Sequence, residues 1–455
     1  MPDHRCGTVP TNATPLTIRR LADRAWRRIC AIPALRQDAL LYAASGCWAL
    51  VIWRVAISND YREWGAWATV PYLLAAAGCE LAFRHERRRP WESPRASRSF
   101  DPARAMAMLG LVVFTLFIPL AVQVARRADT YSGAQAQPEV AVVERAGDRL
   151  ARFQDPYPRD PINQGKSPWT DNPQIDARSY FPYLPAMSVF GLASAIPGAG
   201  GLGDARVELA GIALLATLVA LWLLKAAADR KIRLIQVLLL LPTGALPFVT
   251  GGDDLPVLAF MLLALVLAER RQPVWSGLAM GLASAMKLSA WALLALLFFA
   301  ERDQLDRRAG VRYAAAALGV AVPVVLAGIL AGPHAFIVSA VEYPLDLTNN
   351  RSPAKSPLPG RELLKHLPGS GLIELVLLGA VIVVLLVLVA RHLPRDPSQA
   401  AVWTAVAMVA VTLGAPASRF GYLIYPLNLL VWAFVLRSCD TDVATEGVSA
   451  SPVAA

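Results

Sequence analysis

The chain has 455 residues, of which 55% are hydrophobic and only 17% are charged. A soluble domain is usually about a quarter charged, and the apolar residues here come in runs of roughly 16–22, long enough to cross a bilayer core. These features exclude an ordinary soluble protein. The formal charge of +10 does not indicate nucleic-acid binding, because the basic residues lie in short segments between apolar runs, as in cytoplasmic loops of membrane proteins.

The first 37 residues are polar and rich in arginine, which predicts a basic cytoplasmic segment (1–37) rather than a cleavable signal peptide. Two apolar runs, 38–56 and 67–84, then form an N-terminal hairpin. Further arginines follow this hairpin, up to residue 104. We therefore treat 38–104 as one unit, made of the hairpin and a basic inner loop.

A longer region, 105–437, alternates apolar runs with basic turns and two long polar loops. If the N-terminus is cytoplasmic, the basic turns lie inside and the loops 126–206 and 332–371 lie outside. We expect an all-α polytopic membrane protein with about 11–13 transmembrane helices and interfacial helices in its large first outer loop. Residues 438–455 are expected to form a disordered cytoplasmic tail. The expected spans are 38–56, 67–84, 105–125, 207–225, 234–250, 254–269, 275–287 with 289–300, 313–331, 372–391, 400–416 and 422–437.

Two segments decide this topology. Residues 181–198 are apolar but contain three prolines, and a crossing there would turn the later basic turns outward, so we expect an interfacial or re-entrant helix. Residues 275–300 must begin and end on the inner side, because charged turns precede and follow them. They form either two short crossings or one re-entrant hairpin. Both interpretations place Lys287 in the outer half of the protein.

Two aspartates are candidates for the catalytic base. Asp129 follows the third span closely, where a carboxylate suits a base that acts on a hydroxyl beside a membrane-held donor. Spacing alone favours the simpler interpretation, an exposed aspartate paired with Arg126. Asp60 is the rival catalytic residue, since it also follows an outward span and precedes a tyrosine. Its loop is short for an acceptor cleft.

Asp129 is followed by Tyr131, by 155-DPY-157 and by 180-YFPYLP-185. This order resembles the first outer loop of GT-C superfamily membrane glycosyltransferases. It is most similar to the bacterial polyprenyl-phosphate-mannose-dependent mannosyltransferases (the alpha-mannosyltransferase branch), in which a span delivers an aspartate into this loop. The resemblance implies that Asp129 is the catalytic residue and that a GT-C-like fold surrounds it.

Later motifs keep the family's order. The turn 251-GGDD-254 opens a helix, and 277-GLAMGLASAMK-287 resembles the family's central stretch, which ends in a lysine. The segment 416-PASRFGYLIYP-426 resembles its last outer turn. The resemblance covers roughly 105–437, which it implies is a GT-C-like catalytic membrane domain. The chain departs from the pattern in its extra N-terminal hairpin, in Gln154 where a glycine usually precedes Asp-Pro-Tyr, and in its Gly-Gly-Asp-Asp turn.

The resemblance implies an inverting displacement, in which an aspartate takes the proton of the acceptor hydroxyl and a polyprenyl phosphate leaves. Outward-facing cations would stabilise the leaving group. Arg419 and Lys287 are the first candidates, and a snorkelling or interfacial role is the alternative for each. Arg351 and Lys355, in the second outer loop, fit either a lipid-phosphate headgroup or contact with an anionic lipid surface.

Asp253 and Asp254 lead a helix, so they either cap it or contact the acceptor or a cation. The remaining predicted acceptor or sugar-binding residues could instead anchor the protein at the membrane interface or structure the loop. They are Tyr131, Asp155, Tyr157, Tyr180 and Tyr183. No cofactor is predicted and no metal-binding residues are assigned, although the aspartate pair leaves a divalent cation open.

The sequence thus predicts an integral-membrane glycosyltransferase that moves a hexose, by resemblance mannose, from a polyprenyl-phosphate donor to a glycolipid or glycan acceptor. It would act on the outer face of the cytoplasmic membrane. Its partners are the donor, the acceptor and the lipid bilayer, with no nucleic acid. The alternative is a transporter or flippase of a lipid or sugar. A transporter should show paired ionisable residues or broken helices near the membrane midplane.

Overall fold

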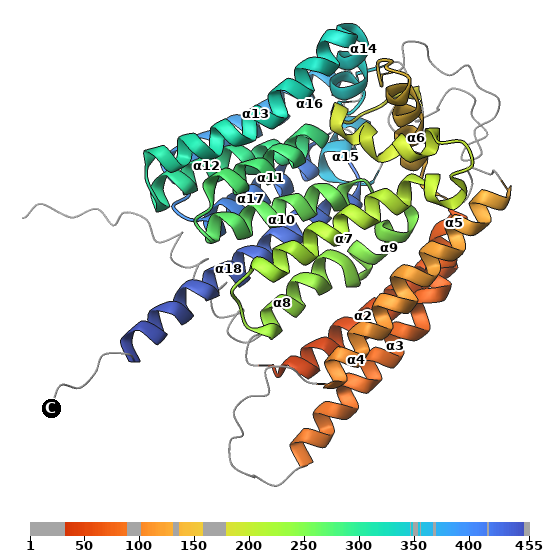
Figure 1. Cartoon of the computed structure of the whole chain (residues 1–455), viewed down its shortest axis with the longest axis vertical. Coiled ribbons are helices and arrows are strands. Elements are labelled where there is room, and N and C mark those ends of the chain that lie inside the picture. The colour runs from red at the N-terminus through yellow and green to blue at the C-terminus, as the bar shows by residue number, and fades with distance from the viewer. Residues whose placement is uncertain are drawn as a thin grey trace, which may run out of the picture.

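The computed structural model describes residues 32–88, 102–130, 136–157, 179–345, 347–348, 354, 356–366, 370–415 and 418–449. Every regular element in these ranges is a helix (Figure 1). Seven helices are long and apolar enough to cross a membrane, or eight if one bent pair counts as a span. The expected all-α polytopic membrane fold is confirmed.

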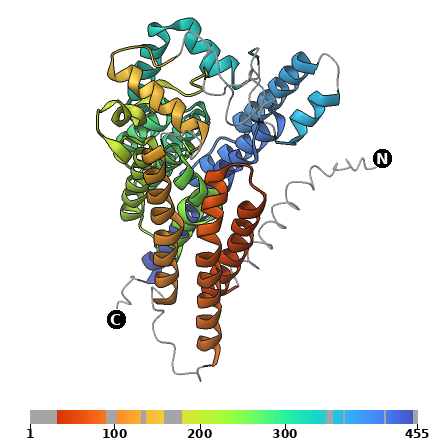
Figure 2. The same ribbon diagram turned by 90° about the vertical axis from the view of Figure 1, so that its right-hand side faces the viewer.

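The N-terminal hairpin consists of α2 (Ala34–Val55) and α3 (Asn59–Arg88). The next rod is formed by α4 (Pro102–Leu111), the π-helix η1 (Val112–Phe117) and α5 (Ile118–Thr130). Figure 1 shows these helices in red and orange along one flank of the core. Figure 2 shows them projecting together below the rest of the bundle.

Prolines explain how the hairpin attaches to its neighbours. Pro119 has no N–H to donate to the carbonyl of Thr115 one turn earlier, and the helix widens into a π-turn just before it. The freed carbonyl accepts a hydrogen bond from the indole of Trp64 on α3, at 3.1 Å. A break before Pro242 similarly leaves the carbonyl of Leu240 to accept from the buried Tyr72 hydroxyl. Two proline-disrupted helices are thereby tied to α3.

Charged side chains hold the end of the hairpin at which α2 begins. Arg104 donates to Asp38 at 2.5 Å and also contacts Asp229. Asp38 accepts from Arg233 and, at 3.0 Å, from Gln236. Since Asp38 and Arg104 are almost fully buried, removing either charge would take one ionic partner from the other and unbalance a buried network, which is costly.

The core begins with α7 (Ala205–Leu223), followed by the bent pair of α8 (Ala228–Ile235) with η6 (Gln236–Leu240) and α9 (Pro242–Thr250). The central helix is α10 (Asp254–Glu269), whose bounds match the expected span 254–269. Eleven of its side chains are buried, including Leu258, Met261 and Leu265. This explains its continuous apolar sequence, because a helix that is apolar all round is buried on all sides.

The segment expected to contain two short crossings or a hairpin forms α11 (Pro273–Met286), the short 3₁₀ turn η7 (Leu288–Ala290) and α12 (Trp291–Gln304). Each α-helix has 14 residues, and Lys287 lies between them in extended conformation. The indole of Trp291 donates to the carbonyl of Ser284 at 2.9 Å and holds the turn. The next helix, α13 (Arg307–Ala331), is a full span-length helix.

The C-terminal part contains α14 (Pro333–Ile337), η8 (Val338–Glu342), α15 (Pro359–His366) and α16 (Ser370–Arg391). It ends with α17 (Pro397–Gly414), η9 (Phe420–Leu423) and α18 (Ile424–Ser449). α18 continues through residues 438–449, which belong to the segment that composition predicts to be a disordered tail. No proline lies between Pro426 and Pro452 to interrupt it.

The described parts of the loop that we expect on the outer side (126–206) contain helices. These include α6 (Pro138–Ala151), η4 (Pro185–Ala195) and η5 (Gly200–Gly203). η4 is a 3₁₀ helix of 11 residues, roughly 22 Å long at about 2 Å per residue, and therefore shorter than a membrane span. α6 and η4 touch through glycines: a Cβ on Gly147 would lie 2.1 Å from the carbonyl carbon of Gly191. Only residues without a Cβ permit this backbone contact.

Candidate active site

Polar side chains gather at one end of the bundle, opposite the basic last turn of α3 and the basic turns after α10 and α12. Lys287 is one centre of this cluster. Its ammonium contacts Asp253 at 2.8 Å and Asp254 at 2.5 Å. Its Nζ also lies 5.3 Å from the ring centroid of Tyr183. The loop lysine, the aspartates at the start of α10 and the outer-loop tyrosine thus meet in space.

Burial sets the electrostatics here. Burial raises the pKa of Asp253 to about 6, with Lys287 acting to lower it and Asp254 to raise it. For Lys287, burial alone would lower the pKa, but the two aspartates together raise it well above its usual value. The lysine is therefore charged at neutral pH. With both aspartates ionised, the three groups carry a net charge of −1.

A chain of two hydroxyls, one from η7 and one from α18, supports Asp254. Ser289 donates to the hydroxyl of Tyr425 at 3.0 Å, and Tyr425 donates to Asp254 at 2.6 Å. On the other side, the turn before Asp253 depends on Gly251, whose φ of 96° belongs to the left-handed region. A Cβ there would also lie 2.1 Å from Val140. Backbone and hydroxyl contacts together fix where Lys287 is held.

Arg419 is the second centre. Its guanidinium donates to Glu139 at 2.8 Å. Burial opposes the charged form of Arg419, but Glu139 and its neighbours raise the pKa of the guanidinium. Tyr422 interacts electrostatically with both Arg419 and Lys287, so the two cations belong to one cluster.

Glu139 lies in the first turn of α6 and points into this cluster. It interacts electrostatically with Asp253 and with Tyr183. One of its oxygens pairs with Arg419, while its Oε2 is buried without a hydrogen-bond partner among the described residues. The site therefore contains a carboxylate oxygen that is free to accept a proton or hydrogen bond from a ligand.

The N-terminal hairpin supplies a wall of the same cluster. Gln137 donates from its side chain to the hydroxyls of Tyr61 and Thr250, both at 2.8 Å. Asp60 is only 1% exposed, and its carboxylate has no side-chain hydrogen-bond partner within the described ranges. Arg206 and Glu139 interact electrostatically with this carboxylate. The short loop before Asp60 therefore does not exclude it from the site, because packing brings it there.

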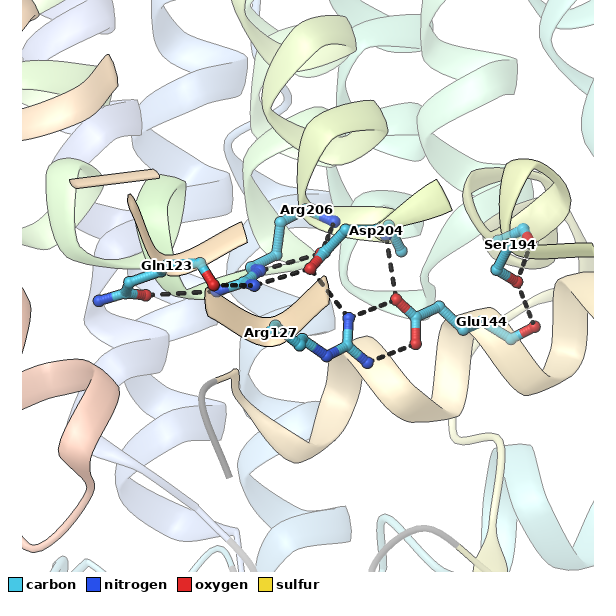
Figure 3. A network of polar contacts seen from close by, with 8 residues as sticks. Gln123, Arg127, Glu144, Ser194, Asp204 and Arg206 are labelled. Carbon is cyan, nitrogen blue, oxygen red and sulfur yellow. Dashed lines mark hydrogen bonds and ion pairs between the residues drawn. The ribbon is translucent and has the colours of Figure 1, made fainter. Parts of the chain in front are cut away.

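An ion network fixes α6 over α5 and α7 (Figure 3). Arg127 donates from two nitrogens to the two oxygens of Glu144, both at 2.6 Å, and its guanidinium lies 3.0 Å from Asp204. Asp204 caps α7 and pairs with the fully buried Arg206 at 2.7 Å. Arg206 in turn contacts Gln123 at 3.3 Å. This network holds the helix that carries Glu139.

The predicted residues fall into three groups. Lys287, Asp253, Asp254, Arg419 and Tyr183 come together in the cluster. Tyr180 stacks on Tyr343 with ring centroids 4.3 Å apart, and Tyr343 interacts electrostatically with Arg419 and Glu139. Three predicted residues lie outside the described ranges: Tyr131, Arg351 and Lys355.

Asp129, Asp155 and Tyr157 lie differently from what the predicted roles require. Asp129 is exposed in the last turn of α5 and makes no hydrogen bond or ion pair with another described residue. Asp155 accepts the backbone N–H of Tyr157 at 3.0 Å. Tyr157 is fully buried and donates to the carbonyl of Tyr183 at 2.9 Å. The predicted roles of these residues stay predictions, and the observed contacts of Tyr157 are structural.

Glu139 and Tyr425 were missed at the level of sequence. An acidic residue that follows a proline at a helix start is expected from the helix dipole alone, so Glu139 carries no distinct signal. Within the described ranges, no three acidic, histidine or cysteine side chains are grouped to hold a metal ion. Lys287 itself occupies the place between Asp253 and Asp254.

A helical membrane bundle that gathers cations, carboxylates and phenols at one end contains the kinds of side chain that enzyme active sites use. The model of Glycosyltransferase family 87 matches residues 183–418, just over half of the chain. The chain therefore belongs to this family and is a membrane glycosyltransferase. No curated protein and no solved structure matches it. The matched region includes Tyr183, the aspartate pair and Lys287, and it ends immediately before Arg419.

Proposed function

We propose that this glycosyltransferase moves a hexose, with mannose favoured by resemblance, from a polyprenyl-phosphate donor to a glycolipid or glycan acceptor. The observation that carries the proposal is the cluster itself, in which Lys287 and Arg419 lie with Glu139 at one end of the bundle. A phosphate leaving group gains charge as the bond to the sugar breaks, and cations that are held in place by ion pairs stabilise that charge. A donor with a lipid anchor suits a site between membrane helices.

The proposed location is the outer face of the cytoplasmic membrane. The basic last turn of α3 and the basic turns after α10 and α12 lie at the opposite end from Lys287 and Arg419, and positively charged turns favour the cytoplasmic side. The cluster would then face outward. A lipid-phosphate donor displayed in the outer leaflet reaches this end of the bundle from within the membrane.

Three carboxylates compete for the role of base. Asp129 is the residue implied by resemblance, and it remains a candidate. Glu139 is better supported, because its unpaired Oε2 is buried beside Arg419 in the cluster. We therefore assign the base to Glu139. Asp60 remains the rival, as a buried carboxylate close to Glu139.

In the proposed step, the carboxylate accepts the proton of an acceptor hydroxyl, and the hydroxyl oxygen forms a bond to the anomeric carbon. The bond between that carbon and the phosphate oxygen breaks. Its electron pair leaves with the polyprenyl phosphate, next to Arg419 and Lys287. Attack from the face opposite the leaving group inverts the anomeric configuration. In this proposal the phenols of Tyr183 and Tyr343 contact the sugar.

The test is transfer of labelled sugar by the purified protein in vesicles, with polyprenyl-phosphate mannose as donor and a membrane glycolipid fraction as acceptor. Arg419→Gln should lower transfer by about a hundredfold, the usual loss when one charge-stabilising donor is removed. Arg126→Gln is the matched control, because Arg126 is an exposed arginine near the same end and pairs with Glu63. If the wild-type protein consumes no lipid-linked sugar but carries a solute across the vesicle membrane, the proposal is wrong and a transporter takes its place.

A further inference from the structure

The inner ends of α2 and α3 form a basic hollow that is separate from the active site. Its volume is about 400 Å³. It is lined by Arg36, Glu80, Phe83, Arg84, Arg87 and Arg88. Four guanidinium groups thus face a single carboxylate.

The charges in this hollow are not balanced. Glu80 pairs with Arg84 at 2.8 Å. Arg36 and Arg87 lie over the ring of Phe83, 5.6 and 5.7 Å from its centroid. Neither of these arginines, nor Arg88, has a carboxylate partner among the described residues. Two positive charges are therefore left over at one aromatic ring, and a third lines the same hollow.

The helix dipole favours a cation at the end of α3 but not at the start of α2. Arg87 and Arg88 lie in the last turn of α3, where a cation is favoured. Arg36 lies in the first turn of α2, at the positive end of that helix, and this turn contains no acidic residue. A cation there is disfavoured unless an anion lies nearby. The position of Arg36 thus points to an anionic ligand in the hollow.

The surroundings indicate that this ligand carries acyl chains. Leu40 lies one turn deeper than Arg36 and is 57% exposed, and Leu81 lies just before Arg84 and is 65% exposed. Both helices pass the length and apolarity test for membrane spans. The hollow therefore lies where a basic helix end meets an apolar helix surface, which is the arrangement that a phospholipid headgroup and its chains require.

We propose that this hollow binds the phosphate headgroup of an anionic phospholipid in the inner leaflet. Arg36 and Arg87 contact the phosphate from two helices, and Phe83 orients their guanidinium groups. The chains run along Leu40 and Leu81. The bound lipid neutralises the cations and holds the hairpin in the membrane. This inference does not depend on which sugar or donor the active site uses.

The test is native mass spectrometry of the full-length protein with phosphatidylglycerol or phosphatidylcholine. The test variant combines Arg36→Gln, Arg87→Gln and Arg88→Gln. The matched control combines Arg302→Gln, Arg307→Gln and Arg308→Gln, three exposed arginines on the same side. The wild type and the control should retain phosphatidylglycerol. The test variant should bind it about a hundredfold more weakly, at about fivefold per arginine.

Three results would overturn the proposal. The first is equal loss of lipid in the test and control variants, which would mean that total charge alone attracts the lipid. The second is equal retention of phosphatidylcholine by the wild type. The third is displacement of phosphatidylglycerol by inorganic phosphate alone, which would make the ligand a free anion. An unchanged elution profile and thermal unfolding of the test variant show that it is folded.

Discussion

Replacing Lys287 with methionine tests the electrostatic description of the active site. The change keeps the length of the side chain but removes the ammonium that lies 2.8 Å from Asp253 and 2.5 Å from Asp254. The Lys287 and Asp253 side chains are 17% and 8% exposed, so solvent screens the pair little. Removing one partner of a buried ion pair costs about 3–5 kcal/mol. We expect about 3 kcal/mol, because Tyr425 still donates to Asp254.

The pH dependence of this loss has a definite sign. Burial raises the pKa of Asp253 from 3.8 to about 6. A carboxyl with a raised pKa in the folded state stabilises the fold below its unfolded pKa, and this contribution is lost as pH rises through the folded pKa. Without Lys287 the pKa of Asp253 rises further. The variant should therefore differ most from the wild type at pH 8 and approach it near pH 5.

Thermal unfolding in detergent between pH 5 and pH 8 measures this effect. Lys225→Met is the matched control, because Lys225 is an exposed lysine in the turn after α7. The triple variant with Lys287→Met, Asp253→Asn and Asp254→Asn should recover most of the stability at pH 8. If Lys287→Met is as stable as the wild type at pH 8, the lysine does not compensate buried carboxylates and the reasoning is refuted.

Two further predictions concern the outer loop. Gly191→Ala should lower the free energy of unfolding by about 3 kcal/mol, because the new Cβ would lie 2.2 Å from the carbonyl oxygen of Val143. The control Gly211→Ala has open space around its Cβ and should leave thermal unfolding nearly unchanged. Equal effects of the two substitutions would contradict the close contact at Gly191. Tyr157→Phe should cost about 1–2 kcal/mol, because the buried carbonyl of Tyr183 loses its donor, while kcat/KM for transfer stays close to wild type. A large loss of kcat/KM with unchanged stability would instead favour the sugar-binding role.

Much of the fold could be predicted because the lengths of the apolar runs and the positions of the basic turns indicate where the helices begin and end. The expected span 254–269 coincides with α10, and the break at Lys287 follows from charged turns on both sides of 275–300. The widened turn before Pro119 could not be predicted in detail, since its carbonyl partner, Trp64, comes from another helix. Hydrogen bonds between distant segments leave no local pattern.

The candidate site was predictable only where a motif marked it. Lys287, Arg419 and the aspartate pair stood in recognisable turns, but their contacts with one another depend on packing. Glu139 resembles an ordinary first-turn acid, and only the ion network between Arg127 and Glu144 directs its helix into the cluster. The sequence therefore identifies the turns that form the candidate site more readily than it identifies the carboxylate that acts as the base.

The most direct test of the central claim is the single-turnover rate of sugar transfer from a polyprenyl-phosphate donor, measured for Glu139→Gln and Asp129→Asn with donor affinity determined in parallel. The account predicts that Glu139→Gln lowers the rate by about 10²–10⁴, the usual contribution of a general base, while donor affinity stays within a few-fold of wild type. Asp129→Asn should transfer at nearly the wild-type rate. Normal transfer by Glu139→Gln, together with loss of transfer in Asp129→Asn, would contradict the account.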